Sequence, residues 1–302
     1  MALVTSGQER YELLSRVLRA KVTMHLTITG LMRDQAAGSQ DRGASWIQTW
    51  VPFACTTFTA SVLFLGVLHA IFGESLARMF PVWPVDLPGR PFWAHSAGVL
   101  LAIAAGMVLA QGRSRDATLG LTALMLVPVL ALALPRAIPS GRIGGEWLNF
   151  LKWLSMAAGP LVVAAQRPIV RAVPWRDRVI TIVAAMAPWL LGAFMVVSAI
   201  LHVRQAEFVS QLMQPWMPWR LFWTYFAAVA LAAGGIGLVV PRTARLAALL
   251  TSLMIFSWFL LVHIPRMLVD PTGPVGWSEM AESLAFSAMA FLLAARAESR
   301  TG

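Results

Sequence analysis

The sequence predicts an all-α, polytopic membrane helix bundle, and three observations support this fold class. Only 13% of the 302 residues are charged, whereas a soluble domain of this size carries roughly 25%. Hydrophobic residues make up 58% of the chain, and its mean hydropathy is +0.69. Eight apolar runs each have about the 20 residues that a helix needs to cross the hydrocarbon layer. They lie near 51–72, 92–111, 117–134, 148–165, 179–201, 221–239, 246–264 and 280–295.

These runs divide the chain into five segments. Residues 1–50 are predicted to form a basic arm, whose apolar residues fit either a helix on the membrane surface or an ordinary soluble helix. Two four-helix membrane units follow at 51–167 and 179–297, joined by a basic linker at 168–178. Residues 298–302 form a short tail. Prolines occur inside three of the runs, which membrane helices tolerate better than soluble helices do.

The basic residues indicate the orientation. About sixteen of them lie in the arm, the linker, the tail and the connections on the same side, and about seven lie in the alternate connections. Because Lys and Arg collect on the cytoplasmic side, we expect a multi-pass protein of the cell membrane with both termini in the cytoplasm. The net charge of +10 therefore reflects topology and does not predict a nucleic-acid partner. The single Cys55 excludes a disulfide framework and a cysteine-based zinc site.

The two membrane units repeat one another. An offset of 133 residues aligns His69 with His202, Glu74 with Glu207 and Trp83 with Trp216. An offset of 130 residues then aligns Trp93 with Trp223, Arg136 with Arg266 and Trp147 with Trp277. The match covers roughly 61–167 and 194–297 and predicts a fused duplication of a four-helix unit. Since each unit has an even number of spans, both enter the membrane in the same direction, about a pseudo-two-fold axis along the membrane normal.

The repeated motifs carry a family resemblance. They are "GxxHxxxxE", a "PxW" or "PWMP" loop, "FW" at the start of the next helix, and "H-x-P-R" after the third helix. In these features the chain resembles the DoxX-like family of integral membrane proteins. The second unit is the closer match, because the first has Ala133 where the second has His263. The resemblance implies helical membrane units and a link to quinone redox chemistry, as in the small subunits of thiosulfate:quinone oxidoreductases. Most members of the family are assigned no reaction.

Polar residues converge at the predicted outer end of the spans. Ionisable groups inside a membrane are costly and indicate a functional site by default. The alternative for Lys152 and Arg136 is that they extend to the lipid headgroups. The candidate ligand-binding residues are His202, Glu207, Tyr225, His263, Arg266, Trp216 and Trp223. In the first unit, His69, Glu74 and Arg136 are predicted to form a structural clasp, in which the Glu on the returning loop bonds the Arg.

The sequence leaves several functions open. The first is binding of a quinone or similar lipid near the outer leaflet, in support of a redox partner protein; the chain, which has no catalytic motif, would be an accessory subunit at most. The alternatives are a small-solute carrier or channel, and a non-catalytic membrane assembly subunit. Haem between His69 and His202, or a metal on His202, Glu207 and His263, lacks any diagnostic spacing, so no metal is predicted. The bilayer is the one certain partner, and the oligomeric state is left open.

Overall fold

The computed structural model describes residues 46–73, 83–84, 86–112, 114–167 and 173–299. The chain divides into two units, Met1–Thr49 and Trp50–Gly302, and the second contains nearly all of the described residues. The predicted basic arm lies outside the described residues except for its last few positions. All regular structure in the described ranges is helical, which confirms the predicted all-α class.

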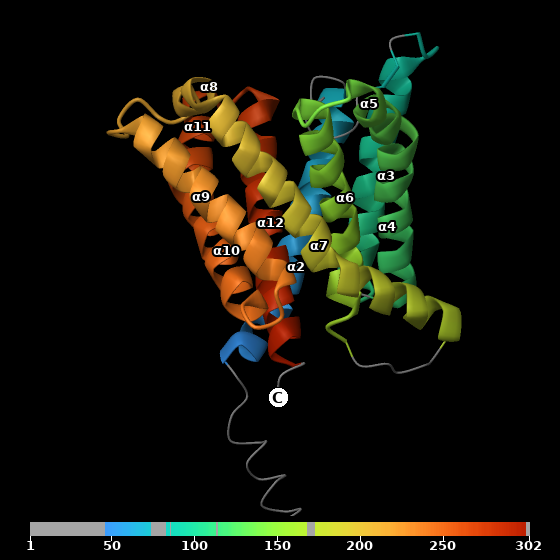
Figure 1. Ribbon diagram of the computed structural model, residues 1–302. Coiled ribbons are helices and arrows are strands. Elements are labelled where there is room, and N and C mark those ends of the chain that lie inside the picture. Colours follow the sequence, from blue (N-terminus) through green and yellow to red (C-terminus); the bar gives the residue numbers. More distant parts are fainter. Residues whose placement is uncertain (1–45, 74–82, 85, 113, 168–172, 300–302) are drawn as a thin grey trace, which may run out of the picture. The chain divides into compact units, whose positions relative to one another are not determined.

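In the described part of the chain, eight helices are long and apolar enough to cross a membrane (Figure 1), so the predicted multi-pass membrane bundle is confirmed. The first two spans are α2 (Trp46–Phe72) and α3 (Arg90–Ala110). The third contains α4 (Arg115–Pro128), η2 (Val129–Ala133), α5 (Leu134–Ala137) and η3 (Ile138–Ser140), and the fourth is α6 (Gly145–Ala164). The fifth is α7 (Pro174–Arg204), which short α8 (Ala206–Gln211) connects to the sixth, α9 (Arg220–Val239). The seventh contains α10 (Ala244–Trp258), η4 (Phe259–His263) and α11 (Ile264–Val269), and the eighth is α12 (Pro274–Glu298).

Several helices begin before the predicted apolar runs, and α7 and α12 are two of them. The predicted linker at 168–178 is helical from residue 174 onward, because α7 begins at Pro174. Helix α12 begins at Pro274, six residues before the predicted apolar run at 280–295. Proline suits the first turn of a helix, where its missing N–H would have no intrahelical partner. Polar residues can occupy such a turn, so hydropathy alone places both starts too late.

The third and seventh spans each contain a π-helical turn in front of a proline. In η2 the Leu134 N–H bonds the Val129 carbonyl, and in η4 the Ile264 N–H bonds the Phe259 carbonyl, five residues back in each case. The next residue in each span is a proline, which has no N–H and whose ring would clash with the carbonyl four residues earlier. The wider π turn relieves that clash and lets the helix continue through the proline.

The helices pack in the same order in both membrane segments. Helix α3 packs on α4 and α4 on α6, as α9 packs on α10 and α10 on α12. Figure 1 shows α3 and α4 on one side of the bundle and α9 and α10 on the other. Helices α6 and α12 lie between them and contact each other, and α6 also packs against α7. In α6, Gly159 lies against the buried ring of Phe58 from α2.

Glycines bring the first and second helices of each segment close together. A Cβ on Gly98 of α3 would overlap the α2 backbone at His69 and Ala70. A Cβ on Gly235 of α9 would lie 2.7 Å from the Gly192 carbonyl oxygen of α7. Small residues at such contacts allow membrane helices to gain van der Waals packing, which replaces the hydrophobic driving force that lipid removes.

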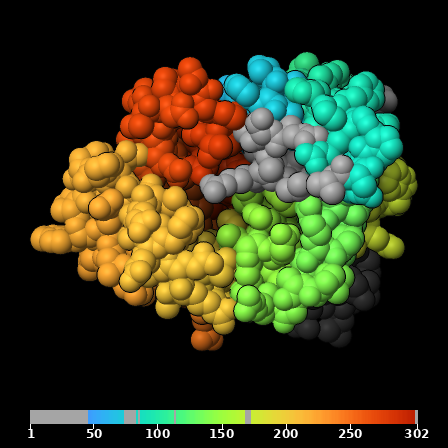
Figure 2. Space-filling view, turned by 90° about the horizontal axis from the view of Figure 1, so that it is seen from above, coloured from blue at the N-terminus to red at the C-terminus, as the bar shows by residue number. Residues whose placement is uncertain are grey.

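One end of the bundle is held by ion pairs between α4 and α7. Arg115 bonds Asp177, and Arg176 bonds Asp116, so each helix supplies one acid and one base. The opposite end carries α5, α8 and α11 (Figure 1). Figure 2 views the molecule at that end, with α5 and the start of α6 in green and α11 and the start of α12 in red-orange.

Candidate functional site

A charged cluster lies where α11 meets the start of α12. Arg266 Nη1 is 2.9 Å from the Glu279 carboxylate, and His263 Nδ1 is 3.8 Å from the same Glu279 oxygen. The three side chains are only 17–26% exposed. Among the residues that the structure describes, Nδ1 of His263 has no hydrogen-bond partner. The cluster therefore combines a paired arginine with an imidazole whose buried Nδ1 faces the same carboxylate and makes no described hydrogen bond.

Two local features of the backbone assemble this cluster. The π turn η4 ends at His263, and α11 begins at Ile264 with a proline as its second residue, so Arg266 follows His263 by about one turn. The early start of α12 places Glu279 about 8 Å along that helix, at 1.5 Å per residue. The close approach of α11 to α12 is visible at Gly276, where a Cβ would lie 2.9 Å from the Met267 Cα.

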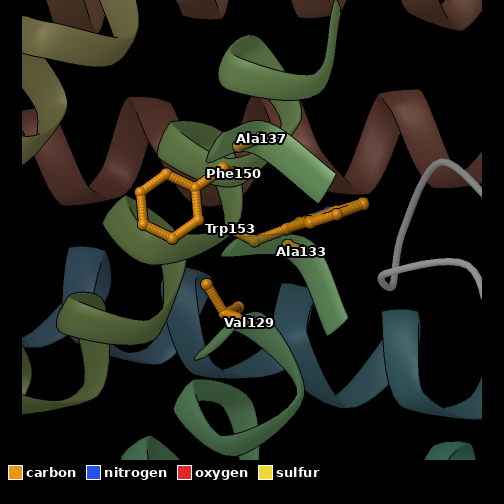
Figure 3. Close-up of a cluster of buried hydrophobic side chains, with 5 residues drawn as sticks. All are labelled: Val129, Ala133, Ala137, Phe150 and Trp153. Carbon is orange, nitrogen blue, oxygen red and sulfur yellow. The ribbon is translucent and has the colours of Figure 1, made fainter. Parts of the chain in front are cut away.

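The corresponding place in the first membrane segment is filled by hydrocarbon. Val129, Ala133 and Ala137 form a buried cluster there with the rings of Phe150 and Trp153 (Figure 3). Moving 130 residues along the chain replaces Ala133 by His263, Phe150 by Met280 and Trp153 by Ser283. Asn149 likewise corresponds to Glu279. The two places thus share a backbone frame and the arginine, Arg136 or Arg266, but the position of His263 is apolar in the first segment.

A second ion pair lies deeper in the bundle. Lys152 Nζ of α6 is 3.0 and 2.9 Å from the two carboxylate oxygens of Glu282 in α12, and both side chains are under a fifth exposed. Lys152 thus pairs with an acid from the other segment and does not extend to the headgroups. Glu282 follows Glu279 by three residues, which puts both acids on one face of α12.

The structure brings together only part of the predicted ligand site. His263 and Arg266 meet, but no described hydrogen bond or ring contact joins either of them to Tyr225 or Trp223 on α9. Tyr225 is 44% exposed, Trp223 is 39% exposed, and Trp216 in the preceding loop is 60% exposed. In the described aromatic contacts, Trp223 meets only rings of its own helix, which suits anchoring at a membrane interface.

Two further predicted residues lie apart from the cluster. His202 is half-buried near the end of α7, and its Nδ1 is 2.8 Å from the Ser198 carbonyl oxygen of its own helix. Glu207 is exposed on α8, and no described ion pair includes it. The partner of Arg266 is therefore Glu279 and not Glu207. The arginine in this segment joins the third helix to the fourth, whereas the repeated motif predicts a contact with the loop after the first helix.

The predicted clasp of the first segment is described only in part. Glu74 lies outside the described residues. Arg136 Nε is 3.8 Å from the Glu146 carboxylate at the start of α6, so this arginine also faces the fourth helix. His69 is almost fully buried in α2, close to the α3 contact at Gly98. Among the described residues, no group of three or more His, Cys, Asp or Glu side chains could hold a metal ion.

Sequence reasoning missed Glu279, although one signal could have found it. The residue precedes the apolar run that predicts the last span, so hydropathy assigns it to a connection. A helix start at Pro274 would have placed Glu279 and Glu282 on one helical face, directly after the Arg266 segment. Helix-start chemistry would therefore have extended the last span and placed both acids inside it.

Comparison with known proteins gives one match. Residues 191–299 match a family model described as a domain of unknown function (DUF8561). The match spans about a third of the chain and contains the whole cluster of His263, Arg266 and Glu279. No curated protein and no solved structure matches the chain.

Proposed function

We propose that the chain is a DoxX-like membrane protein that binds the polar head of a quinone or similar lipid at His263, Arg266 and Glu279. The proposal assigns ligand binding to this chain and electron transfer to a redox partner protein. It also includes the tandem duplication, which the sequence match predicts. The recurrence of the π turn 130 residues apart and the equal packing order of the two segments support that duplication.

The difference between the two segments carries the proposal. The first segment also has an arginine paired with its fourth helix, Arg136 with Glu146, but it has Ala133 in place of His263, packed against Phe150 and Trp153. An apolar filling is the less costly solution inside a membrane, because buried ionisable groups must be desolvated. A partly buried imidazole that is present in one copy and replaced by hydrocarbon in the other favours a ligand site retained once.

The chemistry of the cluster fits a carbonyl headgroup. The Arg266 charge is neutralised by Glu279, so the cluster has little net charge and offers no strong attraction to an anion. A neutral imidazole donates from one ring nitrogen and accepts at the other, and the buried Nδ1 has no described partner. A carbonyl oxygen would accept a hydrogen bond from this ring, while an isoprenoid or acyl chain remained in the lipid.

A binding assay with a short-chain ubiquinone tests the proposal. The purified protein in detergent is titrated with the quinone by isothermal calorimetry. His263→Ala should weaken binding by about five- to 150-fold, because a lost hydrogen bond to a buried polar group costs about 1–3 kcal/mol. His95→Ala is the matched control, since His95 is exposed on α3 and bonds the Ala70 carbonyl. Ser283→Trp should also block binding, since it reproduces the filling of the first segment. Equal binding by wild type and both site variants would refute the site.

The proposal places the cluster near the outer leaflet, with both termini in the cytoplasm. Alkaline phosphatase fused at Asp86, in the connection before α3, should be active because the enzyme folds only after export. The same reporter fused after Gly302 should be inactive. The opposite result would move the cluster to the cytoplasmic leaflet and leave its geometry unchanged.

A further inference from the structure

The contact between Lys152 and Glu282 joins α6 of the first membrane segment to α12 of the second. Both carboxylate oxygens of Glu282 are within hydrogen-bonding distance of Lys152 Nζ. The side chains are 13% and 16% exposed, so water screens the pair only weakly. Glu282 is eight residues from the start of α12, which places the pair roughly 12 Å into that helix.

The two residues occupy corresponding positions in the proposed duplication, since they are 130 residues apart. In a two-fold arrangement, a residue meets its own equivalent only at the axis. Two further contacts lie on either side of such an axis. Gln166 Nε2 donates to the Leu292 carbonyl, and Arg296, which is 130 residues after Gln166, donates to the Ala165 carbonyl. The donors of these two contacts correspond, but their acceptors differ by three residues, because the equivalent of Leu292 is Val162 and not Ala165. The α6–α12 contact thus approximates the reciprocal form of a homodimer interface, with opposite charges at its centre.

We propose that Lys152 and Glu282 select the pairing of α6 with α12 of the same chain and oppose pairing of α6 with α6 of a second copy. This inference rests on the proposed duplication and is independent of the ligand. Two α6 helices related by the same axis would bring two Lys152 ammonium groups together. Like charges at such a spacing repel strongly where water is scarce. Two α12 helices related by the same axis would bring two Glu282 carboxylates together, and these would repel each other in the same way.

The choice between α12 of the same chain and α6 of a second copy matters during synthesis, because α6 is made before α12. The first membrane segment is complete before α12 has been made, and segments of a long chain fold in that order. During this interval the face of α6 that will receive α12 is available to the α6 of a neighbouring chain. A neutral residue at position 152 would permit that contact, whereas Lys152 opposes it until Glu282 arrives.

Full-length variants separate selection from simple stabilisation. Lys152→Glu and Glu282→Lys each place like charges at the centre and should lower the apparent melting temperature. The double exchange, Lys152→Glu with Glu282→Lys, should restore it to near the wild-type value. The neutral pair, Lys152→Met with Glu282→Met, should melt at or above the wild-type temperature, because apolar replacements of buried ion pairs are often neutral or stabilising. This neutral chain should nevertheless associate more with other copies.

Association is measured by expressing two differently tagged copies of the same variant together and capturing one tag in mild detergent. The neutral pair should increase recovery of the second tag several-fold over wild type, and the charge exchange should not. Glu298→Lys is the control on the same helix, because its ion pair with Arg245 joins α12 to α10 and not to α6. Recovery by the neutral pair equal to wild type would overturn the proposal, as would a charge exchange no more stable than the single reversals. Quinone binding by the charge exchange would remain at the wild-type level in either case, which separates this test from that of the ligand site.

Discussion

Replacing Gly98 by alanine should lower the apparent melting temperature of the purified protein by several degrees. The new Cβ would overlap the α2 backbone at His69 and Ala70, and its distance to the Ala70 Cα would be 2.7 Å. Backbone atoms cannot rotate away as a side chain can, so α2 and α3 must move apart along their contact. Overpacking of this kind costs about 1–3 kcal/mol, and the backbone contact favours the upper end of that range. The measurement is a thermal scan in detergent at a fixed rate, because unfolding of such a protein is irreversible.

The same helix offers a matched control. Gly106 lies two turns further along α3, and a Cβ there would meet only Leu63 Cδ1, at an ordinary 3.9 Å. Gly106→Ala should therefore be neutral or raise the melting temperature slightly, since alanine favours a helix over glycine by about 0.5–1 kcal/mol. Equal effects of the two substitutions would show that the close helix contact at Gly98 does not limit stability.

Glu279→Gln should destabilise the protein by about 2 kcal/mol, because it leaves Arg266 charged and partly buried without its carboxylate. Removing one partner of a fully buried pair costs more, but the Arg266 side chain is 26% exposed and water offsets part of the loss. The expected fall in melting temperature is about 4–8 °C for a chain of this size. Quinone binding should fall as well, since His263 loses its neighbouring carboxylate.

Glu207→Gln is the control, with the same chemical change at an exposed position on α8. No described ion pair includes Glu207, so the expected effect lies within about 0.5 kcal/mol. A larger loss at Glu207 than at Glu279 would restore the clasp that the sequence motif suggested and contradict the pairing of Arg266 with Glu279.

The sequence predicted the fold better than the site, for a physical reason. Membrane spans are defined by long apolar runs, and a run of this kind is visible without knowledge of any contact. The partners of Arg266 and Lys152 depend on which helix faces which, and that information is not local. Lys152 and Glu282 correspond in the sequence repeat, yet their contact follows only from the packing of α6 on α12.

The repeated motif also points to the wrong glutamate. Glu207 recurs with its histidine and tryptophan in both units, whereas Glu279 corresponds to Asn149 and has no repeated signal. A repeat identifies what both copies share, which is mostly architecture. Under the proposed duplication, the residues in which the copies differ, His263 against Ala133 and Ser283 against Trp153, point more directly to the proposed ligand site.

Under the proposed duplication, the π turns help to decide which features of the chain are older than the duplication and which are younger. A turn with one extra residue, in front of a proline at the same position of both copies, was present in the ancestral single unit. The polar cluster and the aromatic filling occupy that same frame in different copies, so at least one of them arose after the gene had doubled. The opposite charges of Lys152 and Glu282 also arose after the duplication. Two identical ancestral units would have carried the same residue at both of these equivalent positions. Under the proposed duplication, the π turn is therefore older than the duplication, and the charged residues near it differ between the two segments because they changed afterwards.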